Sequence, residues 1–369
     1  MSASPSAKMP IISWACPLLA VAFYVAASSV GFKDALPPGV TGIALALLLM
    51  PVLFGAIFAA VYHAETIAHW SGEPYGTLIL TVAVTVIEVA LIASVMMSDA
   101  NGSPALARDT VFAVVMTVCN GLAGLCILVG GLKYREQSFR VPGAAAYVTV
   151  LIVMATLTLV LPNYTRETPG PSYSDSQLIF VAVVTVVLYA AFLYIQTVRH
   201  RDYFIIQAGD QGWHETHSMR QLALSGLLLL VALVAIIMLS KKFAVVVELG
   251  REAAGAPAPV TGLIVAILIL LPEGIAAVQA ARKDALQKSL NLALGSALAT
   301  IGMTFPAVTI VALALHTPLT LGLDPSDTVL LALTLLVSTM TFATGRTNIL
   351  YGFVHLVIFA TFLFLTFQP

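Results

Sequence analysis

Two apolar stretches, TLILTVAVTVIEVALIASVMM (77–97) and VTGLIVAILILLPEGIAAVQA (260–280), decide which fold is expected. Each is long enough to cross a bilayer as a helix. Each also contains one glutamate slightly past its middle, Glu88 in the first and Glu273 in the second. An ionisable side chain at that depth costs roughly 2.5–3.5 kcal/mol on insertion scales. Two such residues at comparable depth indicate a site for cations or protons.

The whole chain has the composition of an integral membrane protein, with the lipid bilayer as its surroundings. Of its 369 residues, 59% are hydrophobic and 9% are charged, whereas soluble domains have about 25% charged residues. The formal net charge is −1 and there is no basic stripe, so no nucleic-acid partner is expected. Cys16, Cys119 and Cys126 all lie in apolar stretches, which fits neither a disulfide framework nor a zinc site. No cofactor is expected.

Eleven apolar segments are predicted to cross the membrane, so the fold class is an all-α integral membrane protein. The segments are approximately 11–31, 40–62, 77–97, 110–131, 143–161, 177–196, 220–240, 260–280, 289–314, 328–344 and 349–367. A tight turn at 345–348 joins the last two. Eleven of the 17 Lys and Arg residues lie in the N-terminus and the even-numbered loops, which predicts a cytoplasmic N-terminus.

The two halves of the chain resemble each other. Glu88 is followed, after one loop, by Asp109 at the start of the next span, and Glu273 is followed by Asp284 in the same way. Matching spans are five apart, an odd number, so the repeats enter the membrane in opposite directions, as in many secondary transporters. The predicted domains are an N-terminal segment with the first helix (1–39), a first five-helix repeat (40–196), a central cytoplasmic loop (197–219) and a second five-helix repeat (220–369).

The inversion predicts a shared site for Glu88 and Glu273 near mid-membrane. Two carboxylates in a low-dielectric site cannot both ionise cheaply, so the pair takes up either a divalent cation or protons. A hard cation such as Ca²⁺ needs about 6–8 oxygen ligands. The candidates for additional ligands are Thr85, Asn120 and Ser296.

The residues next to each glutamate support this prediction. Thr81 and Thr85 precede Glu88 at helical spacing, so the three share one helix face. Pro272 precedes Glu273 and removes a backbone donor, a local break that transporters use at ion sites. Two alternatives remain open: the glutamates hydrogen-bond neighbouring helices, and the small and polar residues serve helix packing.

Several longer stretches resemble a known family. GEPYGTLILTVAVTVIEVALIASVM, RDTVFAVVMTVCNGLAGLCILVGG, LLPEGIAAVQA with NLALGSALATIGMTFPAV, and FATGRTNILYGFVHL are similar to the bacterial calcium/proton antiporters of the cation/calcium exchanger superfamily. The resemblance implies one extra N-terminal helix plus two inverted five-helix repeats, located in the bacterial inner (cytoplasmic) membrane. It also implies that the repeat glutamates, here Glu88 and Glu273, alternately bind cation and proton. The family's Gly-Asn-x-x-Glu signature is replaced by VTVIE (84–88) and ILLPE (269–273), which lack the amide.

The expected function is therefore secondary antiport of Ca²⁺, or alternatively of Na⁺ or K⁺, against protons by alternating access. One competing hypothesis is a proton-insensitive cation channel lined by the same carboxylates. A more remote hypothesis is an intramembrane enzyme, which would need a nucleophile–base or metal-ligand set at membrane depth. The sequence has no H-E-x-x-H pattern and no paired aspartates within the spans, so the protein is not expected to be an enzyme.

Overall fold

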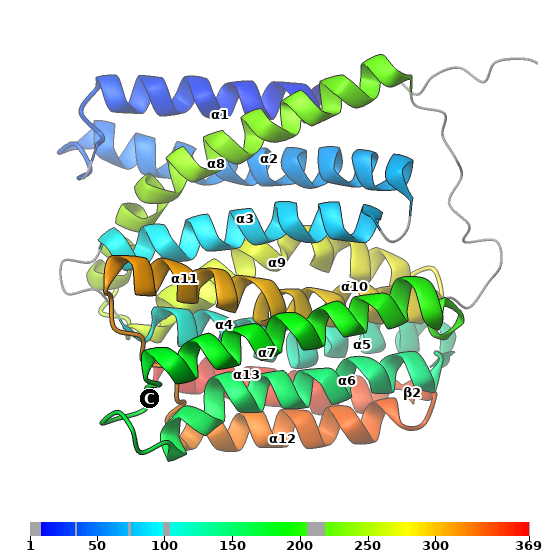
Figure 1. Cartoon of the computed structure of the whole chain (residues 1–369). Coiled ribbons are helices and arrows are strands. Elements are labelled where there is room, and N and C mark those ends of the chain that lie inside the picture. Colours follow the sequence, from blue (N-terminus) through cyan, green and yellow to red (C-terminus); the bar gives the residue numbers. More distant parts are fainter. Residues whose placement is uncertain (1–8, 34, 73–74, 99–103, 205–217, 369) are drawn as a thin grey trace, which may run out of the picture. The chain divides into compact units, whose positions relative to one another are not determined.

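A computed structural model describes residues 9–33, 35–72, 75–98, 104–204 and 218–368 of the chain. Within these residues, 11 helices are long and apolar enough to cross a membrane, which confirms the predicted count and the helical fold class (Figure 1). The elements are α1 (Ile11–Ser29), α2 (Val40–Ser71), α3 (Tyr75–Ser98), α4 (Leu106–Met116), η1 (Thr117–Leu122), α5 (Ala123–Tyr134), β1 (Glu136–Ser138), α6 (Val141–Ala155), η2 (Thr156–Val160), η3 (Leu161–Tyr164), α7 (Asp175–Tyr194), η4 (Ile195–Arg199), η5 (Arg201–Tyr203), α8 (Met219–Ala253), α9 (Pro259–Ala281), α10 (Leu286–Ala299), η7 (Thr300–Thr304), α11 (Phe305–Leu315), α12 (Pro325–Phe342), β2 (Arg346–Asn348) and α13 (Ile349–Phe367).

Contacts between these elements divide the chain into two compact units. The first unit comprises Met1–Gly102 and Gly209–Gly250, and contains α1, α2, α3 and most of α8. The second comprises Ser103–Ala208 and Arg251–Pro369, and contains the other elements. The units cut across the predicted repeats, because α2 and α3 belong to the first repeat and α8 to the second. A contact unit is not a sequence repeat, so the domain boundaries remain a prediction. The central loop falls largely on 205–217, outside the described residues.

Two helices are longer than their apolar cores predict. α2 continues to Ser71 rather than ending near 62, and α8 continues to Ala253 rather than ending near 240. At about 1.5 Å per residue, α8 is roughly 52 Å long, well beyond the roughly 30 Å hydrocarbon core of a bilayer. Helical hydrogen bonds are local, so a helix continues past the membrane edge until the chain offers a stop signal. Hydropathy detects only the apolar part of such a helix.

The first unit is built around α2, which packs against both α1 and α3. His63 of α2 is fully buried, and its Nε2 lies 2.9 Å from the main-chain carbonyl oxygen of Ser13 in α1. Lys242 follows the predicted span 220–240, yet it lies inside α8 and is 2% exposed. Its ammonium donates to the carbonyl oxygen of Phe32 and lies 4.9 Å from the centre of the Tyr24 ring. A carbonyl and aromatic faces thus take the place of water around this charge.

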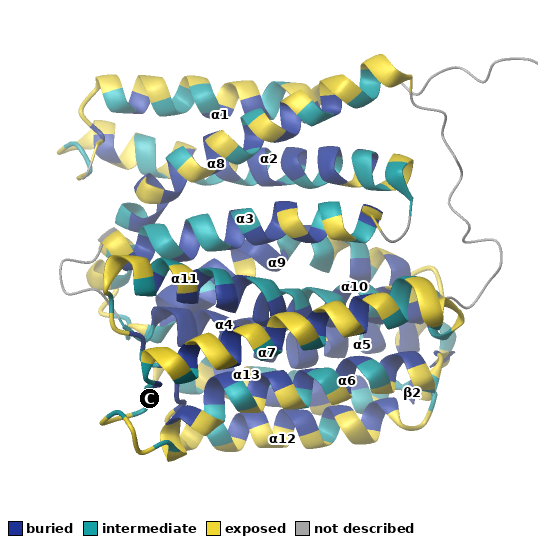
Figure 2. Cartoon of the chain, in the orientation of Figure 1, coloured by how far each residue is buried: buried dark blue, intermediate teal, exposed yellow. Residues whose placement is uncertain are grey.

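The core of the second unit is the helix α4–η1–α5, which is continuous through a π-helical turn. It is the most deeply buried of the candidate spans, with 83% of its apolar window inside the protein (Figure 2). α9 packs on α4 and α10, and α13 packs on α5. Glycines allow the closest approaches: a Cβ added at Gly352 of α13 would lie 2.8 Å from the amide nitrogen of Leu128 in α5. α13 and α5 are thereby packed backbone against backbone.

Outward faces of the helices remain apolar, as a lipid environment requires. Large exposed hydrophobic side chains lie on α7, α8, α12 and α13, including Phe180, Leu230, Leu336 and Phe353. On a water-soluble protein so much exposed apolar surface would cause aggregation. These faces are therefore assigned to lipid contact.

Two local features were not predicted. Wide π-helical turns interrupt the fourth and ninth spans, at η1 and η7, and these two spans correspond in the predicted repeat. Where a tight turn was expected at 345–348, β2 pairs antiparallel with β1, and Gln137 lies opposite Thr347. The paired segments are far apart in the chain, so no local sequence pattern indicates the pairing.

Candidate functional site

Glu88 lies in the middle of α3, in the first unit. Only 2% of its surface is exposed, and Thr81 and Thr85 are each 9% exposed. Positions three and seven residues before a helical residue share its face, so these side chains form one buried stripe of oxygen atoms along α3. A carboxylate this deeply buried has to be balanced by polar partners, a bound cation or a proton.

Glu273 lies in α9, in the second unit, directly after Pro272. The residue is half-buried and its Oε2 atom is inaccessible to solvent. Pro272 has no N–H group, so the carbonyl oxygen of Leu268 loses its usual helical donor. The predicted break in the helix is nevertheless wrong, because α9 continues unbroken from Pro259 to Ala281 with Pro272 inside it. The carbonyl oxygen of Leu268, five residues before Glu273 on the same helix, is therefore free to accept from another donor or to bind a cation.

Gly262 fixes the position of α9 against α4. A Cβ added at this glycine would lie 2.8 Å from the carbonyl carbon of Asp109 and 2.9 Å from the amide nitrogen of Thr110. Backbone atoms cannot rotate away as a side chain can, so any side chain at 262 would push the helices apart. Glu273 is about three turns further along the same helix. The close approach at Gly262 therefore determines where Glu273 lies within the second unit.

Asn120 lies in the π-helical turn η1 and is part of a buried polar network. Its Nδ2 donates to Thr334 Oγ1 at 2.8 Å, and its Oδ1 lies 3.1 Å from His355 Nδ1. His355 Nε2 in turn lies 3.1 Å from Thr341 Oγ1. A neutral imidazole with its proton on Nδ1 satisfies every member: it donates to the amide oxygen and accepts from the threonine. A cation at Asn120 would have to share Oδ1 with His355.

The sequence pattern pointed to Asn120 but missed its threonine partners. Thr334 and Thr341 are seven residues apart in α12, and therefore lie on one helix face. Both are at most 1% exposed. Two threonines on one face of an apolar span are a sequence pattern that would have predicted these partners.

The predicted ligands are distributed over both units. Ser296 lies half-buried in α10, which packs against both α9 and η1. The elements that contain Glu273, Asn120 and Ser296 therefore pack against one another in the second unit, whereas Glu88 and Thr85 lie in the first. The proximity of Glu88 to Glu273 remains a prediction. Thr300, a neighbour in the sequence, begins the π-helical turn η7 and is 1% exposed.

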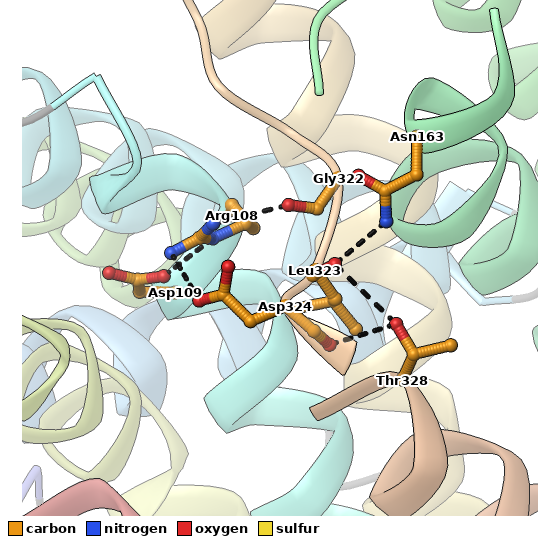
Figure 3. A network of polar contacts seen from close by, with 7 residues as sticks. All are labelled: Arg108, Asp109, Asn163, Gly322, Leu323, Asp324 and Thr328. Carbon is orange, nitrogen blue, oxygen red and sulfur yellow. Dashed lines mark hydrogen bonds and ion pairs between the residues drawn. The ribbon is translucent and has the colours of Figure 1, made fainter. Parts of the chain in front are cut away.

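A second polar cluster lies at the beginning of α4, centred on Arg108 (Figure 3). Its Nε contacts Asp109 Oδ1 at 2.8 Å, and its Nη2 lies 3.9 Å from Asp324 Oδ2. Nη1 donates to the carbonyl oxygen of Gly322 at 3.1 Å. The Arg108 and Asp109 side chains are 9% and 7% exposed, whereas that of Asp324 is 69% exposed.

The Arg108 cluster joins the start of α4 to the segment before α12. The same segment is held from its other side, where Asn163 Nδ2 donates to the carbonyl oxygen of Leu323 at 2.7 Å (Figure 3). From the sequence, Asp109 could be recognised only as the residue at the start of a span. Its ion pair with the buried Arg108 was not predicted. Across the described ranges, no three His, Cys, Asp or Glu side chains come close enough together to hold a metal ion.

Comparison with known proteins gives a family match over both predicted repeats. The sodium/calcium exchanger protein family matches residues 41–198 and 224–368. The chain is 45% identical over 367 residues to the putative ionic transporter y4hA of Sinorhizobium fredii, covering 99% of this chain and 98% of that protein. It is 35% identical over 326 residues to the sodium-potassium/proton antiporter ChaA of Escherichia coli, covering 87% and 88%.

The fold also has a match among solved structures. The chain superposes on the crystal structure of the Ca²⁺/H⁺ antiporter protein YfkE with a TM-score of 0.71 and 19% identity, over 97% of this chain and 100% of that one. At this identity the likeness concerns the fold alone. Together with the family match and the two sequence relatives, it leads to one conclusion: the chain belongs to the sodium/calcium exchanger protein family.

Proposed function

We propose that the protein is a cation/proton antiporter that exchanges protons for Ca²⁺, Na⁺ or K⁺ across the bacterial inner membrane. The observation that carries the proposal is Glu88, a carboxylate 2% exposed in the middle of an apolar membrane span. The printed names of the relatives support it, since ChaA is a sodium-potassium/proton antiporter and YfkE a Ca²⁺/H⁺ antiporter. Each of these names pairs a small cation with the proton.

Charge balance explains how a pair of carboxylates supports this exchange. With both Glu88 and Glu273 ionised, the pair carries two negative charges, which one Ca²⁺ or two protons neutralise. With one of them protonated, a single Na⁺ or K⁺ neutralises the other. An ionised, unloaded pair in a low-dielectric site is costly. The carrier therefore changes sides mainly when loaded, and this requirement couples the two fluxes.

Further oxygens near each carboxylate complete the proposed cation shell. Thr85 shares the buried face of Glu88, and the carbonyl freed by Pro272 lies on the same helix as Glu273. Asn120 and Ser296 are proposed as additional ligands on the elements that pack against α9. Hydroxyl and carbonyl oxygens are hard ligands that suit Ca²⁺, and fewer of them suffice for a monovalent ion.

The direction of exchange follows from the predicted orientation. With the N-terminus in the cytoplasm, protons entering from outside would drive export of the cation by alternating access between the two inverted repeats. The cation and the proton each shift the equilibrium between the inward-facing and outward-facing states only as far as their affinity differs between the two states.

The two competing hypotheses are set aside. A channel has no such coupled cycle, and the family is one of exchangers, which argues against both a channel and an intramembrane enzyme.

A cation panel in proteoliposomes tests this proposal. Vesicles are loaded acidic inside, with a trapped pH indicator, and CaCl₂, NaCl, KCl or choline chloride is added outside. We expect the internal pH to rise with at least one of the three metal cations and not with choline, because each cation that enters must exchange for protons. Cation uptake without a change in internal pH would contradict antiport. So would the absence of a response to every cation.

A further inference from the structure

The second unit contains a groove of about 540 Å³ on the surface of its membrane-spanning part. α9 forms one wall, and η1 with α5 and α13 form the other; the apolar lining includes Leu122, Leu125, Ile267, Ile275, Leu356 and Phe359. Gly121 and Gly274 also line the groove; a Cβ added at Gly121 would lie 3.1 Å from the Phe359 ring, so this glycine lets α13 pack closely on η1. Leu125, Ile267 and Ile275 are 39%, 41% and 44% exposed, so the groove opens at the surface of the second unit.

One end of this groove is cationic. Arg282, which follows the last residue of α9, lines it and is exposed. Lys133 Nζ and Tyr134 Oη both donate to the carbonyl oxygen of Arg282 at 3.0 Å, which holds a second positive charge against the main chain of Arg282. The neighbouring carboxylate of Asp284 accepts a hydrogen bond from Gln137 Nε2 at 2.9 Å. Two cations and an interfacial tyrosine thus lie where the apolar wall ends, with one carboxylate beside them.

We propose that this groove binds an anionic phospholipid, with one acyl chain along α9 and the phosphate on Arg282 and Lys133. From Ile267 to Arg282 the wall extends about 22 Å along the helix, more than the roughly 15 Å half-thickness of the hydrocarbon core, so it accommodates a chain from one leaflet. An arginine fork and a lysine ammonium suit phosphate oxygens. Basic pockets between transmembrane helices on the cytoplasmic side are known sites for anionic headgroups. Arg282 lies on the predicted cytoplasmic side.

Native mass spectrometry of the full-length protein tests the site. The protein in detergent is titrated with phosphatidylglycerol or with phosphatidylcholine of the same acyl chains. We expect one phosphatidylglycerol to be retained in preference to phosphatidylcholine, and Arg282→Gln to weaken that retention about fivefold. Leu125→Trp fills the groove without changing charge and should reduce retention equally. Inorganic phosphate, which has the charge without the chain, should not displace the lipid.

Arg199→Gln is the matched control, because it removes an exposed arginine at the end of η4, on the same predicted side. It should leave phosphatidylglycerol retention unchanged, and thermal melting in detergent shows whether each variant is folded. Equal retention of the two lipids by the unmodified protein would overturn the proposal, as would wild-type retention in folded Arg282→Gln. If Arg282→Gln weakens phosphatidylglycerol retention and Leu125→Trp does not, the groove is not the binding site. None of these outcomes depends on the transport activity.

Discussion

Replacing either Glu88 or Glu273 with glutamine is expected to reduce proton-driven cation uptake to the level of protein-free liposomes. Glutamine has nearly the shape of glutamate, yet it neither bears a negative charge nor takes up a proton. Each variant therefore loses the charge that attracts the cation and the group that binds the proton. The same acid-loaded vesicles and pH indicator measure the effect for each transported cation.

The fold should tolerate both substitutions, since an uncharged amide is less costly to bury than a carboxylate. Melting temperatures in detergent are expected to equal or exceed that of the unmodified protein. Glu136→Gln is the control, because Glu136 is an exposed carboxylate in β1 and lies outside the candidate site. Full exchange by either membrane-span variant, with Glu136→Gln also active, would mean that these carboxylates are not the shared ligands.

Gly262→Leu is expected to destabilise the protein by more than about 3 kcal/mol, beyond the usual range for overpacking. The new side chain would begin 2.8 Å from the carbonyl carbon of Asp109, so α9 and α4 would have to separate. Glu273 would move with α9. The variant should therefore melt at a lower temperature and, where it still folds, exchange more slowly; both are measured in parallel with the unmodified protein.

Gly226→Leu provides the matched comparison. Gly226 also lies inside a membrane-spanning helix, α8, but a Cβ there would meet nothing within 4 Å. Its replacement by leucine should be neutral, or stabilising by up to about 1 kcal/mol, because glycine is a poor helix former. Equal destabilisation by the two substitutions would show that loss of glycine, and not the contact with α4, is responsible.

The number and positions of the spans could be predicted because hydropathy acts over each segment independently of its neighbours. The ends of α2 and α8 could not, since both helices continue into polar sequence where hydropathy no longer follows helix formation. The pairing of β1 with β2 joins distant segments of three residues each, too short for any periodicity. The division into two compact units likewise depends on tertiary contacts.

Prediction of the candidate site from the sequence was limited in the same way. Glu88, Glu273 and Pro272 were recognisable because each is costly in an apolar helix, so its presence alone is informative. The partners of Asn120 were not recognisable, because threonine is common in membrane helices and its role depends on which helix it faces. The same holds for Arg108, whose contact with Gly322 bridges α4 and the segment before α12.

The central claim is that cation and proton compete for the same carboxylates, and proton release on cation binding tests it most directly. A transported cation is added to the purified protein in weakly buffered detergent solution, and a pH indicator is read while calorimetry reports binding. Because the cation favours the ionised carboxylates, binding must expel protons held by the pair. The account predicts proton release from the unmodified protein and none from Glu273→Gln. Cation binding by the unmodified protein without proton release would contradict it.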